Sequence, residues 1–198
     1  MSELDGLVVG ADGRARCAWS GEDPEYRRYH DEEWGVPLHD DRRLFEKICL
    51  EGFQAGLSWI TILRKRPRFR EVFLGFDPLV VAKLGEEDVD RLMDDTGIIR
   101  NRAKILATIG NARATLTLRE REGEGALDRL VWSFHEEAQP DCVVRPGDIP
   151  TSTPASVALS KRLRAEGFRF VGPTTMYALM QSAGLVDDHI AGCFRAAG

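Results

Sequence analysis

Two cysteine–histidine pairs, one near each end of the chain, have the side chains that a metal site needs. Twelve residues separate Cys17 from His30, and three separate His189 from Cys193. On a helix, residues four positions apart share one face, so we expect His189 and Cys193 to point the same way. Two thiolates and two imidazoles would form a closed tetrahedral Zn²⁺ site of the structural kind, which leaves no position open for water.

Such a site would tie the first ordered residues to the last ones, where a domain otherwise frays. The alternative is coincidence, because the two pairs lie 158 residues apart, far from the compact spacing of a zinc finger. Spacing alone leaves both interpretations open, since ligand geometry is not visible in a sequence. Of the remaining cysteines and histidines, Cys49 is expected in a buried helix, Cys142 in a loop or strand, and His39 and His135 on the surface.

A glutamate on an apolar helix face is the second candidate for chemistry. Counting back from Glu51 by three and by seven gives Ile48 and Leu44, and counting forward by four gives Ala55. Helical geometry therefore puts the carboxylate on the stripe that faces inward. A buried carboxylate is destabilising unless charge or hydrogen bonds compensate for the lost water. Two interpretations stay open: a structural partner holds Glu51, or the carboxylate is kept for a cationic ligand.

Aromatic residues gather in the same part of the sequence as this glutamate. They are Trp19, Tyr26, Tyr29, Trp34 and Trp59. Aromatic clusters usually pack in a core. Beside a buried acid, the same rings could instead line a pocket for a flat, positively charged base, in which the acid supplies charge and the rings supply stacking.

The composition is that of a globular protein of 198 residues. Hydrophobic residues make up 43% and charged residues 30%, which argues against a disordered or fibrous chain. No apolar run approaches the roughly 18 residues of a membrane-spanning helix, so no membrane partner is expected. The N-terminus lacks the basic region of a secretory signal, and four cysteines are too few for a disulfide scaffold. We therefore expect a cytoplasmic protein.

The net charge of −5 argues against nucleic acid as a partner, but the basic residues are clustered. The first cluster is Arg64-Lys65-Arg66-Pro67-Arg68-Phe69-Arg70, the second is Arg100, Arg102 and Lys104, and the third is Lys161, Arg162, Arg164 and Arg169. Solvated helix faces explain such clusters more often than DNA does, so charge alone leaves the partner open.

Helical periodicity predominates, which predicts an all-α fold with a single core. The helices expected are 40–53, 77–84, 86–93, 101–118, 127–134, 153–165 and 174–184, with Asp40 or Asp41, Asn101, and Ser152 or Thr153 near their starts. Residues 140–154 are expected to form a loop, and 141–144 is the only segment with strand-like alternation. We expect one α-helical domain over residues 16–198, preceded by a flexible extension of residues 1–15.

Several long motifs occur together in this chain. They are Arg16-Cys17-Ala18-Trp19, Tyr29-His30-Asp31-Glu32-Glu33-Trp34-Gly35-Val36-Pro37, Leu50-Glu51-Gly52-Phe53-Gln54-Ala55-Gly56-Leu57-Ser58-Trp59, Thr96-Gly97-Ile98-Ile99-Arg100 and Ile149-Pro150-Thr151-Ser152-Thr153. With these motifs the chain resembles the 3-methyladenine DNA glycosylase I family, from about Arg16 to Cys193.

This resemblance implies a helix-hairpin-helix DNA glycosylase fold whose N- and C-terminal segments are joined by a structural zinc ion. The ligands it implies are Cys17, His30, His189 and Cys193. It also implies that Glu51 contacts a flipped base on which Tyr29 and Trp59 stack. Trp19, Tyr26 and Trp34 are then expected to shape the pocket.

The resemblance places the DNA-holding hairpin at residues 170–175. Gly172 would let backbone N–H groups approach a phosphate at the start of a helix that includes Thr174. Phe170 departs from the wider superfamily, which commonly has a glycine there. Asp187 stands where the family typically has asparagine, so no role is carried over to it. Leu57 is either a wedge that fills the vacated base stack or a core residue.

The implied activity is the hydrolytic excision of 3-methyladenine from alkylated double-stranded DNA, after the base is flipped out of the helix. Water is the expected nucleophile and no lysine is required, so we expect a monofunctional, monomeric enzyme without a lyase step. A zinc-stapled DNA-binding module without chemistry is the competing class. A zinc hydrolase is a third, and it needs an open coordination position.

Overall fold

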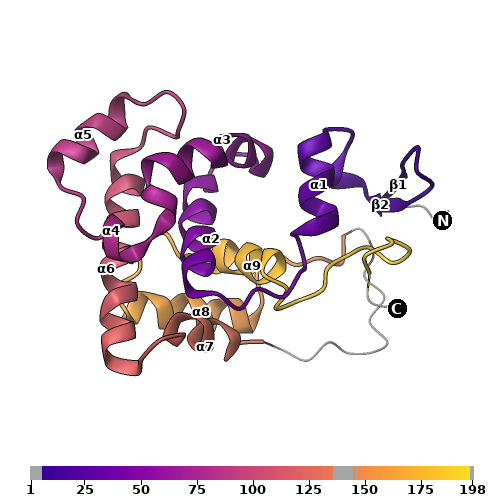
Figure 1. Cartoon of the computed structure of the whole chain (residues 1–198). Helices are drawn as coiled ribbons and strands as arrows, with labels where there is room; N and C mark the ends of the chain where they lie inside the picture. Colours follow the sequence, from indigo (N-terminus) through magenta and orange to yellow (C-terminus); the bar gives the residue numbers. More distant parts are fainter. Residues whose placement is uncertain (1–5, 136–144, 146, 197–198) are drawn as a thin grey trace.

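α-Helices make up most of the chain over the residues that the computed structural model describes, 6–135, 145 and 147–196 (Figure 1). The elements in order are β1 (Leu7–Val9), β2 (Ala15–Cys17), η1 (Ala18–Ser20), α1 (Pro24–Glu32), α2 (Asp41–Gln54), α3 (Trp59–Val72), η2 (Leu74–Phe76), α4 (Pro78–Val81), α5 (Glu86–Asp94), α6 (Arg102–Glu122), α7 (Ala126–Trp132), α8 (Pro154–Ala165) and α9 (Pro173–Ser182). β1 and β2 pair antiparallel, with Leu7 opposite Cys17.

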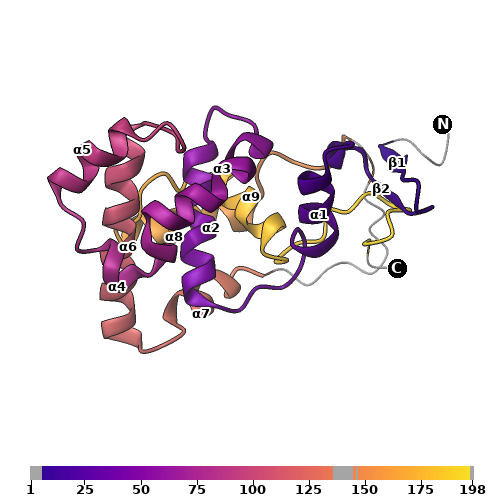
Figure 2. The ribbon, with the colours of Figure 1, turned by 45° about the horizontal axis from the view of Figure 1, so that its top comes forward.

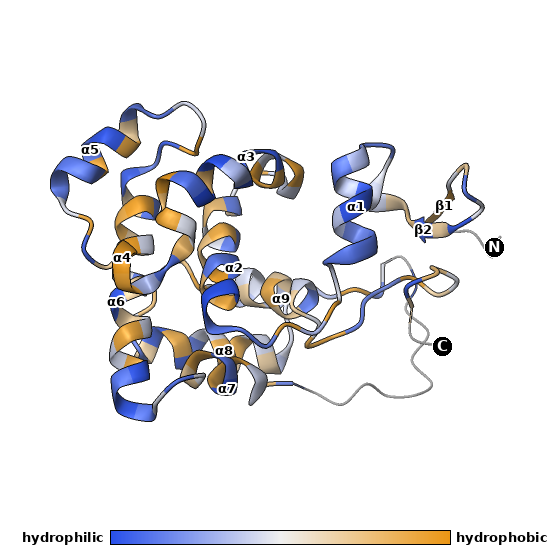
Figure 3. Ribbon diagram, in the orientation of Figure 1, coloured by the Kyte–Doolittle hydropathy of each residue, from blue (hydrophilic) through white to orange (hydrophobic). Residues whose placement is uncertain are grey.

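Helix α2 is the central element of the fold. It contacts α3, α6, α7 and α9, and Leu44, Phe45, Ile48 and Phe53 on it are fully or almost fully buried. Burying each such side chain contributes about 1.5–3 kcal/mol, which explains why this apolar stripe lies at the centre. Colouring by hydropathy shows α5 as largely hydrophilic, and the C-terminal end of α6, at the bottom of the view, as hydrophilic too (Figure 3). The inward stripe of α2 also carries Glu51, so the core positions the carboxylate.

The seven helices expected from periodicity are present, with shifted ends. The Asp40 side chain accepts a hydrogen bond from the backbone N–H of Arg43 at the start of α2, and Asn101 and Thr153 cap α6 and α8 in the same way. α6 continues four residues past Leu118, and α4 is shorter than expected. Cys49 is buried in α2, and His39 and His135 are exposed, as expected.

Two helices and the strand pair were not predicted. α1 begins with the capping residue Asp23 followed by Pro24, a start signal that was readable in the sequence. α3 is highly charged and contains Pro67, which obscures its periodicity. The β1–β2 hairpin crosses the expected boundary between residues 15 and 16. The strand expected at 141–144, with Cys142, lies outside the described residues.

The first and the last described segments of the chain lie side by side, at the right of Figures 1 and 2. The backbone N–H of Phe194 donates to the carbonyl of Ala15, and the N–H of Gly35 donates to the carbonyl of Gln181. Cys17, Ile190 and Cys193 form a small buried cluster separate from the main core. No described helix combines the length and apolar character that crossing a membrane would require.

Candidate functional site

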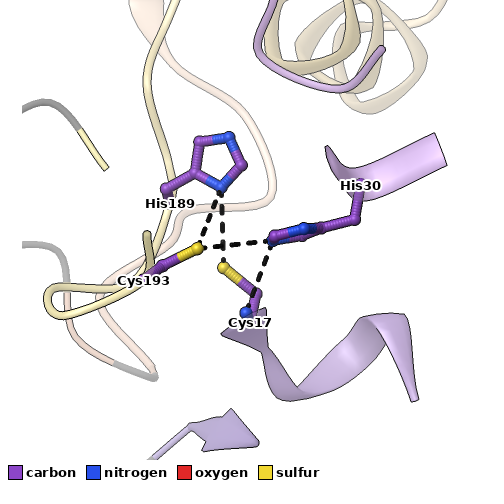
Figure 4. A group of neighbouring side chains, drawn as sticks. All are labelled: Cys17, His30, His189 and Cys193. Atoms are coloured by element: carbon purple, nitrogen blue, oxygen red, sulfur yellow. Dashed lines mark hydrogen bonds between the residues drawn. The ribbon is translucent and has the colours of Figure 1, made fainter. Parts of the chain in front are cut away.

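Cys17, His30, His189 and Cys193 converge at the junction of the two chain ends (Figure 4). Cys17 ends β2 and His30 lies in the last turn of α1. All four side chains are buried, and their ligand atoms lie within 4.8 Å of one another. The four residues that the resemblance implies as a ligand set therefore do lie together, although they come from opposite ends of the chain.

The helical spacing expected for the second pair is wrong. His189 and Cys193 lie in irregular backbone on either side of a turn after α9, not on a helix. Gly192 has a φ of 88°, and the N–H of Cys193 donates to the carbonyl of Ile190. A glycine at positive φ ends any helix there, and the resulting turn brings the two side chains together.

A carboxylate fixes the orientation of the His30 ring. Nδ1 of His30 lies 2.8 Å from Oδ1 of Asp31, and the buried Arg16 guanidinium donates to both oxygens of Asp31. With its proton on Nδ1, His30 turns the lone pair of Nε2 toward the cluster, 3.5 Å from Sγ of Cys193. A carboxylate behind a ligating histidine is the usual support of a zinc site.

Backbone N–H groups and a sulfur–sulfur contact surround the two cysteines of the cluster. Backbone N–H groups of Ile190 and Arg195 donate to Cys17 and Cys193, respectively. Hydrogen bonding to Cys17 lowers the pKa of the Cys193 thiol, while the same contact raises the pKa of Cys17. Nδ1 of His189 faces both sulfurs at 3.7 Å, and its buried Nε2 has no hydrogen-bond partner among the described residues. Two sulfurs and two imidazole nitrogens in one buried cluster fit a tetrahedral, closed metal site.

A cavity of about 210 Å³ lies between α1, α2, α3 and α9. Its lining is Trp19, Tyr26, Tyr29, Trp34, Glu51, Gln54, Trp59, Ile149, Ala178, Gln181 and Ser182. Cavities for drug-sized ligands are about 300–1,000 Å³, so this one suits a single planar ring system rather than a larger ligand. Glu51 and all five aromatic residues singled out in the sequence line the same space.

Glu51 is 4% exposed and forms no salt bridge with a described residue. Burial raises the pKa of its carboxyl from 4.5 to about 7, an effect that Lys47 and the Ser182 hydroxyl partly offset. Burial also lowers the pKa of Lys47 to about 8, and its ammonium lies 5.5 Å from the centre of the Tyr29 ring. The guanidinium of Arg66, also in this region, pairs with Glu33 at 2.6 Å. The structural-partner interpretation of Glu51 therefore lacks an ion-pair partner within the described part of the chain.

The aromatic rings pack edge to face and tilted around this carboxylate. The ring centres of Tyr29 and Trp59 are 5.4 Å apart, and that of Trp19 is 5.0 Å from those of both Tyr26 and Trp34. Tyr29 is almost fully buried, and burial together with the Glu51 charge raises the pKa of its hydroxyl well above the usual value. The rings therefore pack against one another and also line a cavity, so core packing and a pocket are not mutually exclusive interpretations of these residues.

Three polar cavity residues were missed in the sequence. Gln54 follows Glu51 by one turn and was the only one of them with a local signal, since it lies in the same motif. Gln181 donates from Nε2 to Asp188, and Ser182 bonds to Glu51. Asp187 accepts from the backbone N–H of His189. Nothing in the spacing of the last helix indicated that its end faces the cavity.

Helices α8 and α9 pack closely together and are joined by residues 166–172. Gly172 is the N-cap of α9 without a side-chain cap, and Thr174 is exposed. Leu57 is 43% exposed, which excludes the core-packing alternative. Phe170 is 41% exposed and has a φ of 57°, the conformation of a glycine.

The three basic clusters differ in their partners. In the first, Arg64 pairs with Asp23, Arg68 with Asp95, and Arg70 with Glu46. In the second, Arg102 pairs with Glu86 and Asp90, and the Lys104 ammonium donates to backbone carbonyls at the end of α2. In the third, Lys161, Arg164 and Arg169 are exposed and form no salt bridge with any described residue, although Arg162 does. Residues 166–172 with the helix ends that they join are called the α8–α9 hairpin below; Lys161 and Arg164 on α8 and Arg169 within the hairpin have no acidic partner in the described chain.

Comparison with known proteins agrees with this geometry. The family described as methyladenine glycosylase matches residues 19–196. The chain is 56% identical over 179 residues to DNA-3-methyladenine glycosylase 1 of Escherichia coli, covering 90% of this chain and 95% of that protein. A crystal structure of a 3-methyladenine DNA glycosylase I aligns with a TM-score of 0.86 and 55% identity, covering 92% of this chain and 100% of the other.

A further solved structure is that of 3-methyladenine DNA glycosylase I from Staphylococcus aureus, which presents the structural basis of 3-methyladenine recognition by that protein. It aligns with a TM-score of 0.84 and 35% identity over 92% of this chain and 97% of the other. The family match covers most of the chain, and the identities extend over nearly the full length of the relatives. The chain therefore belongs to the methyladenine glycosylase family.

Proposed function

We propose that this protein removes 3-methyladenine from alkylated double-stranded DNA by hydrolysing its N-glycosidic bond. One observation carries the proposal: a buried carboxylate without an ion-pair partner among the described residues, Glu51, lies in an aromatic cavity of the size of a planar ring system. The names of the relatives support the same substrate.

Charge is what separates the damaged base from the normal one. Methylation at N3 makes adenine cationic, whereas unmodified adenine is neutral. Attraction between Glu51 and a cation grows as water is excluded, because the effective dielectric constant falls. A neutral base gains nothing from the charge and leaves it desolvated, so the cavity selects for the cation.

The base reaches the cavity by leaving the helix, because the glycosidic bond is inaccessible inside a duplex. Tyr29 and Trp59 stack on the flipped ring, and Trp19, Tyr26 and Trp34 shape the walls. Leu57, exposed in the loop after α2, fills the space that the base vacates.

Hydrolysis needs little acid catalysis, because the cationic base departs as a neutral molecule. Water attacks C1′ of an oxocarbenium-like sugar, and Glu51 holds the leaving base. No lysine is among the described residues that line the cavity, which supports a monofunctional glycosylase without a lyase step.

The hairpin between α8 and α9 holds the DNA as a helix-hairpin-helix element. Gly172 and Thr174 offer backbone N–H groups at the start of α9, where the helix dipole favours a phosphate. The cations Lys161, Arg164 and Arg169 lie around this hairpin and add sequence-independent attraction.

The Cys₂His₂ cluster holds a structural Zn²⁺, which, when bound, supplies a cross-link between the two ends of the chain. This cross-link positions α1, the source of Tyr26 and Tyr29, against the rest of the cavity. Four protein ligands leave no open coordination position, which argues against a zinc hydrolase. We take residues 16–198 as one domain of a monomeric, cytoplasmic enzyme.

The test is a base-release assay on methylated duplex DNA with the zinc-loaded protein. Chromatography should detect free 3-methyladenine, and the DNA should carry abasic sites without strand cleavage. DNA binding without release of any base would favour the DNA-binding module instead. Strand cleavage at the abasic sites would contradict the monofunctional mechanism.

A further inference from the structure

The side chain of Asn111 binds the backbone of the α8–α9 hairpin from outside it. Asn111 lies on α6 and is 2% exposed. Its Nδ2 donates to the carbonyl of Arg169 at 3.1 Å, and its Oδ1 accepts from the N–H of the same residue at 2.8 Å. Both backbone groups of one hairpin residue are thus paired with a single buried amide, 58 residues away in the sequence.

The next hairpin residue is held in a conformation that its side chain disfavours. Phe170 has a φ of 57°, which puts Cβ close to the following carbonyl and is uncommon for any residue but glycine. A local sequence of this kind does not stabilise such a turn, so the surrounding contacts must impose it.

Two further contacts complete the support of the hairpin. The hydroxyl of Ser160 on α8 donates to the carbonyl of Val171 at 2.6 Å, and Ser160 is 1% exposed. A Cβ placed on Gly52 of α2 would lie 3.2 Å from Cβ of Phe170, so the helix that carries Glu51 approaches the hairpin closely. Gly172 and the start of α9 follow immediately.

We propose that Asn111 is a positioning residue for DNA binding: it imposes the left-handed conformation of Phe170 and thereby orients the N–H groups at the start of α9. The two hydrogen bonds from Asn111 hold Phe170 in a conformation that a glycine would adopt without strain. This inference rests on the proposed function, because it assigns Asn111 to the hairpin that holds the DNA.

The first experiment replaces Asn111 with alanine. Duplex affinity should fall about tenfold, because the variant lacks the two hydrogen bonds that fix the hairpin. The effect should appear in KM and in the Kd for undamaged duplex, with kcat nearly unchanged, since Asn111 does not line the cavity. Thr108→Val is the matched control. Thr108 is also buried on α6, but its hydroxyl donates to the backbone carbonyl of Lys104 in the same helix.

A second pair of variants separates conformation from general stability. Phe170→Ala and Phe170→Gly both remove the ring, and only glycine tolerates the positive φ without strain. With Asn111 present, the alanine and glycine variants should bind DNA within about twofold of each other, because the two hydrogen bonds from Asn111 impose the turn. With Asn111→Ala, the glycine variant should bind about fivefold more tightly than the alanine variant.

Amide hydrogen exchange at Val171, Gly172 and Thr174 gives a readout that needs no DNA. Exchange should accelerate in Asn111→Ala and be restored in part by Phe170→Gly, but not by Phe170→Ala. Wild-type protein that binds no DNA would overturn the proposed function, and the exchange data would still decide the role of Asn111 in the hairpin. Normal duplex affinity in Asn111→Ala, or equal affinity of the two double variants, would overturn this inference alone.

Discussion

Lys47 and Glu51 lie one helical turn apart on α2, yet their charged groups form no salt bridge. Among the residues that the structure describes, no basic nitrogen comes within 4.0 Å of the Glu51 carboxylate. The Lys47 ammonium lies instead near the ring of Tyr29, and Arg66 is occupied by Glu33. The carboxylate is thus buried without a salt bridge to a described residue, and the Lys47 charge and the Ser182 hydroxyl offset only part of the effect of burial. Under the proposed function, a cationic base would supply the rest.

Excision should depend on pH through Glu51. Burial raises the pKa of this carboxyl to about 7, so the free enzyme carries the charge only above that value. We expect kcat/KM for release of 3-methyladenine to fall as the pH drops through about 7. A profile measured from pH 5 to 9 checks this, and a flat profile would mean that the Glu51 charge does not select the substrate.

Stability should change in the opposite direction. The pKa of Glu51 is higher in the folded state than its ordinary value of 4.5, so its stabilising contribution is complete below pH 4.5 and is lost as the pH rises through about 7. Glu51→Gln should therefore be more stable relative to the wild type at pH 8 than at pH 5. Urea unfolding at the two pH values measures the difference, and a variant that loses stability at pH 8 would favour a structural role for Glu51.

Zinc affinity should depend on the carboxylate behind His30. Asp31→Asn removes the negative charge that faces the Nδ1 proton and leaves only a neutral amide oxygen as acceptor, so the affinity should fall about 10- to 100-fold. Asp12→Asn is the control, because Asp12 also pairs with Arg16 but accepts its hydrogen bonds from Arg14 and Arg16 rather than from His30. Competition with a chromophoric chelator gives both affinities. Equal values for the two variants would argue against zinc bound through Nε2 of His30.

Leu57 should matter for duplex DNA and not for the fold. Because its side chain is 43% exposed, Leu57→Ala should change the free energy of unfolding by less than about 0.5 kcal/mol. Excision from duplex should fall about tenfold, since removal of the wedge leaves the unstacked gap empty. Leu79, on α4, is similarly exposed and lies outside the aromatic cavity that Glu51 lines, so the Leu79→Ala variant should excise the base at the normal rate. A similar decrease of the excision rate in both variants would refute the proposal that Leu57 acts as the wedge.

The cations beside the hairpin should account for the salt dependence of binding. Lys161→Ala with Arg164→Ala should lower the slope of log Kd against log salt concentration by about 0.9 for every phosphate that the protein no longer neutralises. Arg64→Ala with Arg68→Ala should change it less, because those guanidiniums are paired with Asp23 and Asp95. Fluorescence titrations of a labelled duplex at several salt concentrations compare the pairs; equal slopes would contradict the assignment.

Residue type and periodicity predicted much of the candidate site. The Cys/His residues of the buried cluster and the glutamate on an apolar stripe are unusual enough in type or position to be noticed in a sequence, and the capping residues Asp40, Asn101 and Thr153 marked three helix starts. Helix α3 was missed because charge and Pro67 hide its inward face.

Long-range contacts were not predictable from local patterns. Ser182 and Gln181 reach the cavity only because α9 packs on α2, and Asn111 reaches the hairpin only because α6 packs beside it. The turn that brings Cys193 beside His189 depends on Gly192 at positive φ. The spacing of four between the two residues pointed to a helix instead. Tertiary packing, rather than propensity, decides each of these positions.

Single-turnover excision by Glu51→Gln tests the central claim most directly. The variant keeps the shape of the side chain and removes its charge, so the rate on DNA containing 3-methyladenine should fall about 100-fold or more. Zinc content, duplex affinity and the folded state should match the wild type. Excision within a few-fold of the wild-type rate by this folded, zinc-loaded variant would contradict selection of the base by the Glu51 charge.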